Sequence, residues 1–414
     1  MRQRLDYSSI VLATGFAVLF FNSGTRNAFG LMLKPMTEDL GWSRSELSLA
    51  LAAFMLVSAL AMPLAGRLVD RYSIRSVLAA GGLIGAVGIG LTGQIQSHWQ
   101  LFVVYGLVYA VGHAATSIPT VSVMISRWFV RRRGFANSVA VSGHAIGQLV
   151  IIMVLASLLG ALGWRTSYAV LGAANLVVVV PLVLAAVRSR PQESSCGPSS
   201  GVQTPDREDA GLSTSAPSAT AAPLRGIFAS RELWLLIVIY GICGFQDFFV
   251  TTHVVAFAID QGMGALLAGN VLALMGILGL LGVLISGFLS DAFGVTRPVV
   301  LCFVMRLPVF AFVLFVQETP AIAAFAFLYG FTLLITAPLT VVFAGNLFGP
   351  SRLGAVSGLI NAVHQITGGL GAFVGALIFD RWESYDGAFV LMAALAVVAL
   401  AATLSLQRGK LRPV

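Results

Sequence analysis

The sequence Gly66-Arg67-Leu68-Val69-Asp70-Arg71 closes one long apolar stretch of this chain. A matching sequence, Gly287-Phe288-Leu289-Ser290-Asp291, closes another apolar stretch 221 residues later. In both copies a glycine precedes an aspartate by four positions, and both copies sit between two apolar segments. A feature that returns at a fixed, long offset indicates that the chain contains two copies of one structural unit.

A second pair of landmarks repeats at almost the same offset. Gly134 is followed ten residues later by His144, and Gly354 is followed ten residues later by His364. The offset is 220, so four landmarks agree in register. We therefore expect two halves that share one architecture.

The composition places both halves in a membrane. Apolar residues make up 57% of the 414 residues, charged residues only 10%, and the mean hydropathy is +0.90. Soluble domains carry about 25% charged residues, so a globular cytosolic enzyme and a secreted domain are excluded. Because one spanning helix takes about 20 apolar residues, the chain has room for twelve spans and little else.

The apolar pattern predicts an all-α membrane protein with twelve transmembrane helices in two pseudo-symmetric six-helix bundles. The expected spans are 9–33, 45–66, 75–96, 99–125, 134–160, 166–187, 231–258, 266–289, 297–317, 320–348, 353–379 and 385–406. Residues 1–188 would form the first bundle and residues 225–414 the second. Residues 189–224 are rich in Ser, Pro, Thr and Gly, which predicts a disordered cytoplasmic linker that acts as a tether.

The basic residues indicate topology. Of the 25 Lys and Arg residues, 19 fall in loops on the side of the amino terminus and 5 on the opposite side. Since Lys and Arg in short loops stay in the cytoplasm, we expect both termini there and a multi-pass protein of the cytoplasmic (inner) membrane. The net charge of +8 thus reports topology, and no nucleic-acid partner is expected. Three cysteines, two of them in apolar runs, imply no disulfide framework.

Several motifs carry a resemblance to a known family. The stretch 66–75 resembles the loop signature of the major facilitator superfamily, although Ser73 stands where the pattern has glycine and Ala292 replaces the arginine of the second copy. Three further stretches are similar to the monocarboxylate porter and oxalate/formate branch of that superfamily. They are Phe29 to Met36 with Gly41 to Arg44, Arg127 to Phe129 with Arg132 to Ala136, and Thr252-His253. The resemblance implies a transporter that moves a solute by rocking two bundles about a central site, without a cofactor.

The repeated loops have a physical interpretation as a conformational latch. Gly66 would let two helices approach closely, and Asp70 would meet the amino end of the eleventh helix, as in the family. The latch would comprise Gly66, Asp70, Arg71, Arg75, Gly287 and Asp291. The alternative is a simple stop-transfer cluster of charges, and the repeat favours the latch.

Function should reside in the few polar groups at bilayer depth, because burying a charge there costs about 2.5–3.5 kcal/mol. These are Arg26, Asp247, Arg306 and four histidines, all within expected helices. In the family the first, fourth, fifth, seventh, eighth, tenth and eleventh helices line the cavity. His113, His144, His253 and His364 all fall on such helices.

This set of side chains suits proton-coupled transport of an anion. Arg26 could hold a carboxylate through its fork of donors, and imidazoles, with a reference pKa of about 6.5, can carry protons. His144 and His364 would face each other across the pseudo-twofold axis. The expected substrate-binding residues are Arg26, Asn27, His113, His144, Gln148, Asn361, His364 and Gln365. For each histidine, a packing hydrogen bond between helices is the alternative.

Asp247, His253 and Arg306 are the candidates for proton coupling. Opposite charges at membrane depth usually neutralise each other or form a relay, so Asp247 and Arg306 form either a structural pair or a proton acceptor with its tuning cation.

One departure from the family pattern concerns the substrate. Many porters of this branch carry an arginine four residues before the second loop-signature glycine, where this chain has Val283, so another cation must hold a carboxylate here.

Three functional classes remain. The first is a secondary transporter of a small organic anion, a mono- or dicarboxylate, coupled to protons by alternating access; we expect it to be monomeric. The second is a proton-coupled exporter of apolar drugs, and the third is a receptor on the same fold that transports nothing. No ATP-binding loop, zinc-ligand spacing or nucleophile motif occurs in the sequence, so neither an enzyme nor a metal site is expected.

Overall fold

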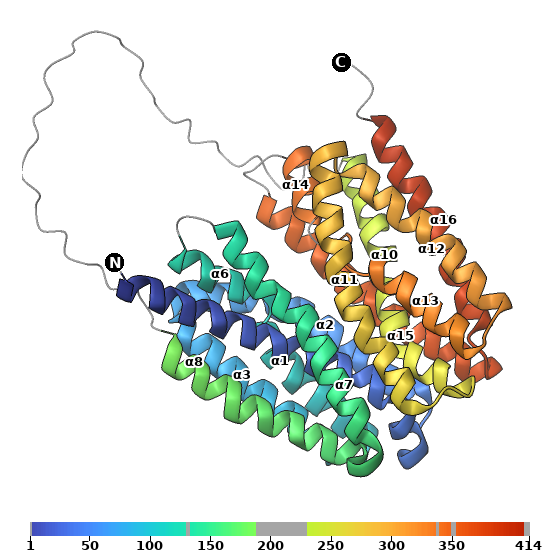
Figure 1. Cartoon of the computed structure of the whole chain (residues 1–414), viewed down its shortest axis with the longest axis horizontal. Coiled ribbons are helices and arrows are strands. Elements are labelled where there is room, and N and C mark those ends of the chain that lie inside the picture. The colour runs from blue at the N-terminus through green and yellow to red at the C-terminus, as the bar shows by residue number, and fades with distance from the viewer. Residues whose placement is uncertain (1, 130–132, 188–229, 337–338, 349–352, 410–414) are drawn as a thin grey trace, which may run out of the picture.

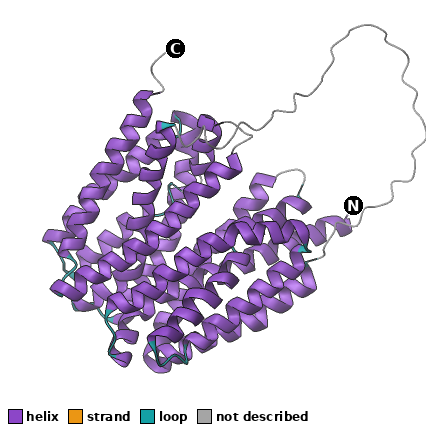
Figure 2. Ribbon diagram, turned by 180° about the vertical axis from the view of Figure 1, so that it is seen from behind, coloured by secondary structure: helices purple, strands orange, loops and turns teal. Residues whose placement is uncertain are grey.

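The structure is a computed structural model that describes residues 2–129, 133–187, 230–336, 339–348 and 353–409. Within these ranges the chain consists of helices joined by short loops (Figure 2). The expected linker, residues 189–224, lies outside the described residues. The prediction of an all-helical membrane architecture is confirmed.

The described part of the amino-terminal bundle contains ten helical segments. They are α1 (Arg2–Leu40), α2 (Arg44–Arg71), α3 (Ile74–Thr92), α4 (His98–Leu101), the π-helix η1 (Phe102–Tyr109), α5 (Ala110–Ala115), α6 (Ile118–Trp128), α7 (Arg133–Ala174), the π-helix η2 (Asn175–Val179) and α8 (Val180–Ala186). Side chains cap two of these helices where the chain turns. Ser43 and Glu46 form a reciprocal capping box at the start of α2, and Ser73 accepts from the Ser76 amide at the start of α3.

The carboxy-terminal bundle repeats this arrangement. Its helices are α10 (Arg231–Asp260), α11 (Ala265–Phe293), α12 (Thr296–Phe315), α13 (Thr319–Thr332), α14 (Leu339–Phe348), α15 (Leu353–Trp382) and α16 (Asp386–Gly409). Ten described helices are long and apolar enough to cross a membrane. One of them, 139–186, is long enough for two spans, and α13 (Thr319–Thr332) is a shorter apolar helix, so the described helices agree with the twelve spans expected from the sequence.

Four spans differ from their expected outlines. The fifth and sixth spans share α7, which turns at Gly163 with φ 69° and ψ 168°, a conformation that only glycine adopts readily. The fourth span is interrupted at Thr116 and Ser117. The tenth span, expected as one helix over 320–348, has a described turn at 333–336 between α13 and α14.

The two bundles meet through three helix pairs, namely α1 with α10, α2 with α15, and α7 with α11. Figure 1 shows the bundles converging at one end and diverging toward the end where α1 begins and α16 finishes. We call the converging end the distal end. There Gly30 of α1 packs so tightly on α10 that a Cβ would collide with the Thr251 carbonyl oxygen. By contrast, a Cβ at Gly66, near the diverging end of α2, would meet no heavy atom within 4 Å.

Candidate functional site

A cavity of about 70 Å³, with several charged and amide side chains in its wall, lies between the two bundles. Since one water needs about 10–15 Å³ by this measure, the cavity has room for about five waters or a solute of similar size. The lining residues are Arg26, Asn27, His144, Gln148, Asp247, Phe248, Thr251, Leu333, Leu334, Thr336 and His364. Only Phe248, Leu333 and Leu334 among them are apolar. Five of the eight expected substrate residues and Asp247 therefore share one cavity.

Arg26 supplies a cation without an anionic partner to this cavity. Its guanidinium lies over the Phe248 ring, with the guanidinium carbon 4.6 Å from the ring centroid, and its side chain is half-buried. Within the part of the chain that the structure describes, Arg26 forms no ion pair and donates no hydrogen bond to the protein. A guanidinium offers five donors, so this residue can accept an anionic ligand without breaking a protein contact.

Asp247 and Arg306 form the ion pair that the sequence suggested. The Arg306 Nη2 atom on α12 donates to Asp247 Oδ1 on α10 at 2.6 Å. The same guanidinium donates to Gln246 Oε1 at 2.9 Å and to the Thr332 hydroxyl at 3.1 Å and carbonyl at 3.2 Å. Arg306 is fully buried, with 0% exposure. Arg306 therefore contacts Asp247 from the protein interior and does not line the cavity. Tyr329 donates a second hydrogen bond to Asp247 Oδ1, at 2.8 Å.

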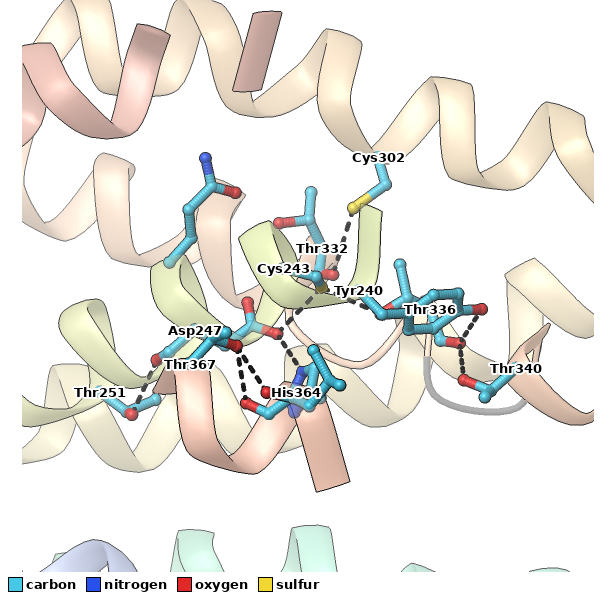
Figure 3. Close-up of polar contacts among 12 residues, drawn as sticks. Tyr240, Cys243, Asp247, Thr251, Cys302, Thr332, Thr336, Thr340, His364 and Thr367 are labelled. Atoms are coloured by element: carbon cyan, nitrogen blue, oxygen red, sulfur yellow. Dashed lines mark hydrogen bonds and ion pairs between the residues drawn. The ribbon is translucent and has the colours of Figure 1, made fainter. Parts of the chain in front are cut away.

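The other carboxylate oxygen of Asp247 faces a different group of side chains (Figure 3). Asp247 Oδ2 accepts from the Cys243 thiol at 3.2 Å and lies 3.4 Å from His364 Nε2. The Cys243 sulfur also lies 3.1 Å from the Thr336 hydroxyl. Asp247 thus connects the buried Arg306 with the buried Cys243 thiol and with the His364 imidazole, which lines the cavity.

Local backbone structure places these groups. A Cβ at Gly244 on α10 would collide with the His364 carbonyl oxygen of α15, so this glycine lets the two helices approach and brings His364 beside Asp247. The turn at 333–336 presents two carbonyls that each accept from a backbone amide and also from a side chain. The Thr332 carbonyl accepts from Arg306, and the Thr336 carbonyl accepts from the Tyr240 hydroxyl at 3.1 Å. Irregular backbone at membrane depth is tolerated where such partners or a polar cavity satisfy it.

The amino-terminal half contributes an uncharged counterpart. Asn27 donates to Gln148 Oε1 at 3.4 Å, and Gln148 Nε2 crosses to the carboxy-terminal bundle, where it donates to the Leu272 carbonyl at 3.1 Å. His144 lines the same cavity, and its Nδ1 atom is buried without a hydrogen-bond partner. The side chains of Asn27 and Gln148 thereby tie the first bundle to the second at the cavity.

The internal repeat relates the two walls of the cavity. His144 and His364 are 220 residues apart, and so are Asn27 and Asp247. The same two helix positions therefore supply the site in each half. The amino-terminal copy has a neutral amide where the carboxy-terminal copy has a carboxylate.

The structure places three expected substrate residues away from this cavity wall. His113 lies inside the amino-terminal bundle, 4% exposed, with neither ring nitrogen hydrogen-bonded, beside a separate cavity of about 20 Å³ that Asn22 and Asn175 also line. Asn361 and Gln365 flank His364 on α15, Asn361 exposed and Gln365 half-buried, and neither lines the cavity. Their binding roles stay predictions.

His253 belongs to a contact between the bundles at the distal end. Its Nε2 atom lies 2.7 Å from the Ala372 carbonyl oxygen and its Nδ1 atom 3.0 Å from the Tyr385 hydroxyl. Arg44, from the amino-terminal bundle, donates to the same hydroxyl at 2.6 Å and to Asp260 Oδ2 at 2.6 Å. The imidazole therefore connects directly to the groups that hold the distal ends together.

We call the set of cross-bundle polar contacts around Arg44 the distal clamp. The Asp380 carboxylate accepts from the backbone amides of Arg44 at 3.1 Å and Ser45 at 2.8 Å. Lys34 adds an ion pair with Asp260 at 2.8 Å. Arg44 also stacks over the Phe379 ring, 3.7 Å from its centroid. The distal clamp comprises Lys34, Arg44, Ser45, Asp260, Phe379, Asp380 and Tyr385. It closes this end of the molecule.

The residues of the expected latch show no such closure in this conformation. Arg71 and Arg75 are exposed, and Gly66 and Gly287 face open space. The side chains of Asp70 and Asp291 lie outside what the structure describes. The latch therefore stays a prediction, for a conformation in which the diverging ends meet.

Sequence reasoning missed the distal clamp, Cys243 and the cavity-lining turn at 333–336. The clamp had one visible signal, since Arg44 and Lys34 are among the few cations on their side of the chain. Nothing in the sequence marked Cys243, because its contacts with Thr336 and Arg306 come from other parts of the chain.

Comparison with known proteins agrees with this architecture. A profile of the Major Facilitator Superfamily matches residues 15–304 and 262–413. The chain therefore belongs to the major facilitator superfamily, whose members are transporters and not enzymes. This confirms the family resemblance drawn from the loop motifs.

Individual relatives extend over nearly the whole chain. The chain is 22% identical over 413 residues to the uncharacterised MFS-type transporter YcxA of Bacillus subtilis (strain 168), covering 96% of this chain and 94% of the relative. It is 27% identical over 392 residues to monocarboxylate transporter 11 of Mus musculus, covering 92% and 83%. The structure resembles a bacterial homologue of the human lysosomal transporter Spinster in an inward-facing, unoccupied conformation (TM-score 0.78, 15% identity, 97% of both chains). It also resembles the D323A mutant of the nucleoside transporter NupG (TM-score 0.78, 13% identity, 96% and 99%).

Proposed function

We propose that this protein is a secondary transporter that carries a small organic anion, a carboxylate with one negative charge, through the cavity between its bundles. The observation that supports this most strongly is Arg26, a cation that lines the cavity and forms no ion pair with any residue that the structure describes. A charged group at membrane depth is costly, and a ligand that supplies the opposite charge offsets that cost.

The charge of the site favours a monoanion. Arg26 and Arg306 contribute two positive charges and Asp247 one negative charge, so the site carries one positive charge when its histidines are neutral. Asp247 is already paired with Arg306, which leaves Arg26 for the ligand. The amide of Asn27, the imidazole of His144 and the Thr251 hydroxyl line the same cavity and would complete the hydrogen bonding of a carboxylate.

The cation in the cavity argues against the main competing function. An apolar drug does not neutralise Arg26, which forms no ion pair within the described residues, whereas a carboxylate does. The similarity to monocarboxylate transporter 11 is a further point in favour of a carboxylate.

The arrangement of the bundles suits alternating access. The distal clamp holds the bundles together at one end, while Gly66 and Gly287 face open space toward the other. The excess of Lys and Arg on the side of the termini would place both termini in the cytoplasm, with the protein in the cytoplasmic membrane. The conformation would then be inward-facing, as in the Spinster homologue, and the latch would close when the clamp opens.

Proton coupling would act through His253 at the distal clamp. A neutral imidazole donates one hydrogen bond and accepts one, which fits the Ala372 carbonyl oxygen and the Tyr385 hydroxyl. Protonation turns both ring nitrogens into donors, so the hydroxyl can no longer donate to Nδ1. The charged and titratable groups around this imidazole are Tyr385, Arg44, Asp260 and Asp380. A new positive charge beside Arg44 would weaken the clamp and favour its opening.

Transport by purified protein tests this function. Proteoliposomes are loaded with a panel of mono- and dicarboxylates, and exchange against each radiolabelled compound is measured at pH 6 and pH 8, with apolar dyes as the competing substrates. We expect saturable flux of at least one monocarboxylate, faster at the acidic pH, and no dye transport. Dye transport alone would support a drug exporter. Flux of neither class would indicate a receptor that transports nothing.

A further inference from the structure

Three potential metal ligands converge in the wall of the central cavity. They are the Cys243 thiol, the Asp247 carboxylate and the His364 imidazole, and their ligand atoms all lie within 4.8 Å of one another. Cys243 and Asp247 are one helical turn apart on α10, and His364 faces them from α15 (Figure 3). Asp247 and His364 line the cavity, and the His364 side chain is 24% exposed. A solute in the cavity can therefore reach the cluster.

We propose that Cys243, Asp247 and His364 form a binding site for a single thiophilic divalent cation, for which Zn²⁺ is the best fit. Sulfur, imidazole nitrogen and carboxylate oxygen are the ligand types that zinc uses in proteins. Three protein ligands with a fourth position open to a cavity match the arrangement of exchangeable zinc sites rather than closed structural ones. Hard cations such as Mg²⁺ and Ca²⁺ prefer oxygen ligands only.

The spacing of the ligand atoms is close to that of a tetrahedral zinc centre. Zinc bond lengths of about 2.0–2.3 Å place a nitrogen and an oxygen ligand about 3.4 Å apart, and a sulfur and an oxygen ligand about 3.6 Å apart. Here His364 Nε2 lies 3.4 Å from Asp247 Oδ2, and the Cys243 sulfur lies 3.2 Å from the same oxygen. Both distances to Asp247 Oδ2 therefore need to change by only a few tenths of an ångström. The Cys243 sulfur and His364 Nε2 lie within 4.8 Å of each other and must come to about 3.6 Å when zinc binds.

The surroundings of the ligands support a metal. The other oxygen of the Asp247 carboxylate, Oδ1, accepts a hydrogen bond from Arg306. This bond orients Asp247 in the way that hydrogen bonds from outside the ligand set orient metal ligands. Arg306 Nη1 also donates to the Cys243 sulfur at 3.7 Å, so the same guanidinium contacts two of the three proposed ligands. The Thr336 hydroxyl, 3.1 Å from the sulfur and on the cavity wall, stands beside the fourth position.

The charges and protons of this binding step balance. Zn²⁺ replaces the thiol proton of Cys243, which leaves to the cavity, and binds the Nε2 lone pair of His364, whose remaining proton sits on Nδ1. The Asp247 carboxylate is already ionised by its pairing with Arg306. The two anionic ligands neutralise the metal, and the Arg306 charge then remains, so the fourth position favours an anion over neutral water.

Calorimetry on purified, full-length protein tests the site without reference to transport. Zn²⁺ is titrated into protein that carries Cys196→Ser, so that the cysteine outside the described residues cannot bind metal. On this background Cys243→Ser is compared with Cys302→Ser, a matched control, because Cys302 is equally buried but outside the cluster. We expect one Zn²⁺ per chain, at least about tenfold weaker binding in Cys243→Ser and His364→Ala, and no change in Cys302→Ser.

Cobalt provides an independent signature. Co²⁺ added to the same proteins should produce a thiolate-to-metal charge-transfer band in the near ultraviolet that Cys243→Ser lacks and Cys302→Ser retains. Monodisperse elution and an unchanged melting temperature show that each variant is folded, and His364→Ala supports the result if Cys243→Ser does not fold. The proposal is overturned if folded wild-type protein binds no Zn²⁺, or if Cys243→Ser and His364→Ala bind it as tightly as Cys302→Ser.

Discussion

The buried pair of Asp247 and Arg306 offers a quantitative test of how the carboxy-terminal bundle is stabilised. Arg306 is fully buried, and the Asp247 side chain is 8% exposed. Replacing either residue by a neutral one leaves the other charge without its partner at membrane depth. The two variants Arg306→Met and Asp247→Asn remove the two charges one at a time, and the double variant removes both.

The expected magnitudes follow from burial. Removing one partner of a buried ion pair costs about 3–5 kcal/mol, because the remaining charge is uncompensated. Asp247→Asn should lie at the upper end of this range, since Arg306 has no access to the cavity. Arg306→Met should lie at the lower end, because Asp247 keeps Tyr329, Cys243 and His364 as neighbours. The double variant should lose less than the sum of the two, with a coupling energy of about 1–3 kcal/mol.

Reversible unfolding in lipid-containing mixed micelles, with SDS as the denaturant and tryptophan fluorescence as the signal, measures these free energies. Lys34→Met is the matched control, because the Lys34–Asp260 pair is also a short ion pair, at 2.8 Å, but both side chains are 22% exposed. That variant should lose less than about 1 kcal/mol. Additive effects of Asp247→Asn and Arg306→Met would refute the idea that the two charges stabilise each other.

Three further outcomes follow from the fold and the clamp. Gly163→Ala should lower the free energy of unfolding by about 1–3 kcal/mol in the same assay, because alanine is strained at this backbone conformation. Gly160→Ala is the control, since a Cβ there meets open space, and it should cost less. Equal effects of the two substitutions would contradict this explanation. Gly30→Leu should push α1 away from α10 at the distal end, because even a Cβ at this position would collide with the Thr251 carbonyl oxygen. The distance between spin labels placed on the distal ends of the two bundles should therefore lengthen. An unchanged distance would argue against close packing there. His253→Gln should keep substrate exchange but flatten its pH dependence, while His113→Gln should leave that dependence intact; retained pH dependence in His253→Gln would remove this histidine from coupling.

The fold could be predicted from the sequence because two strong signals agreed. The composition leaves a bilayer as the only suitable environment, and the repeat at Gly66 and Gly287 divides the chain into equivalent halves. The interruptions within spans could not be predicted. The turn at 333–336 lies in a continuous apolar run, and only tertiary partners for its carbonyl groups make the break acceptable.

The site was predictable where one residue is unusual by itself. Arg26, Asp247 and Arg306 stand out because charges are rare in spans, and the repeat singled out His144 and His364. The direction of each side chain was not predictable. His113 and His144 both looked like cavity residues, yet the first points into its own bundle. The distal clamp and the Cys243 cluster depend on contacts between distant helices, which spacing along the chain does not reveal.

Binding of an anion at Arg26 is the most direct test of the proposed transport site. Isothermal titration of the carboxylate with the greatest flux is carried out on wild-type protein, Arg26→Gln and Arg26→Lys at one pH. The loss of a charged hydrogen-bond donor, worth about 1.5–3 kcal/mol, should weaken binding by about 10- to 100-fold in Arg26→Gln. Arg26→Lys should lie between that variant and the wild type. Affinity within twofold of wild type in folded Arg26→Gln protein would show that the anion binds elsewhere.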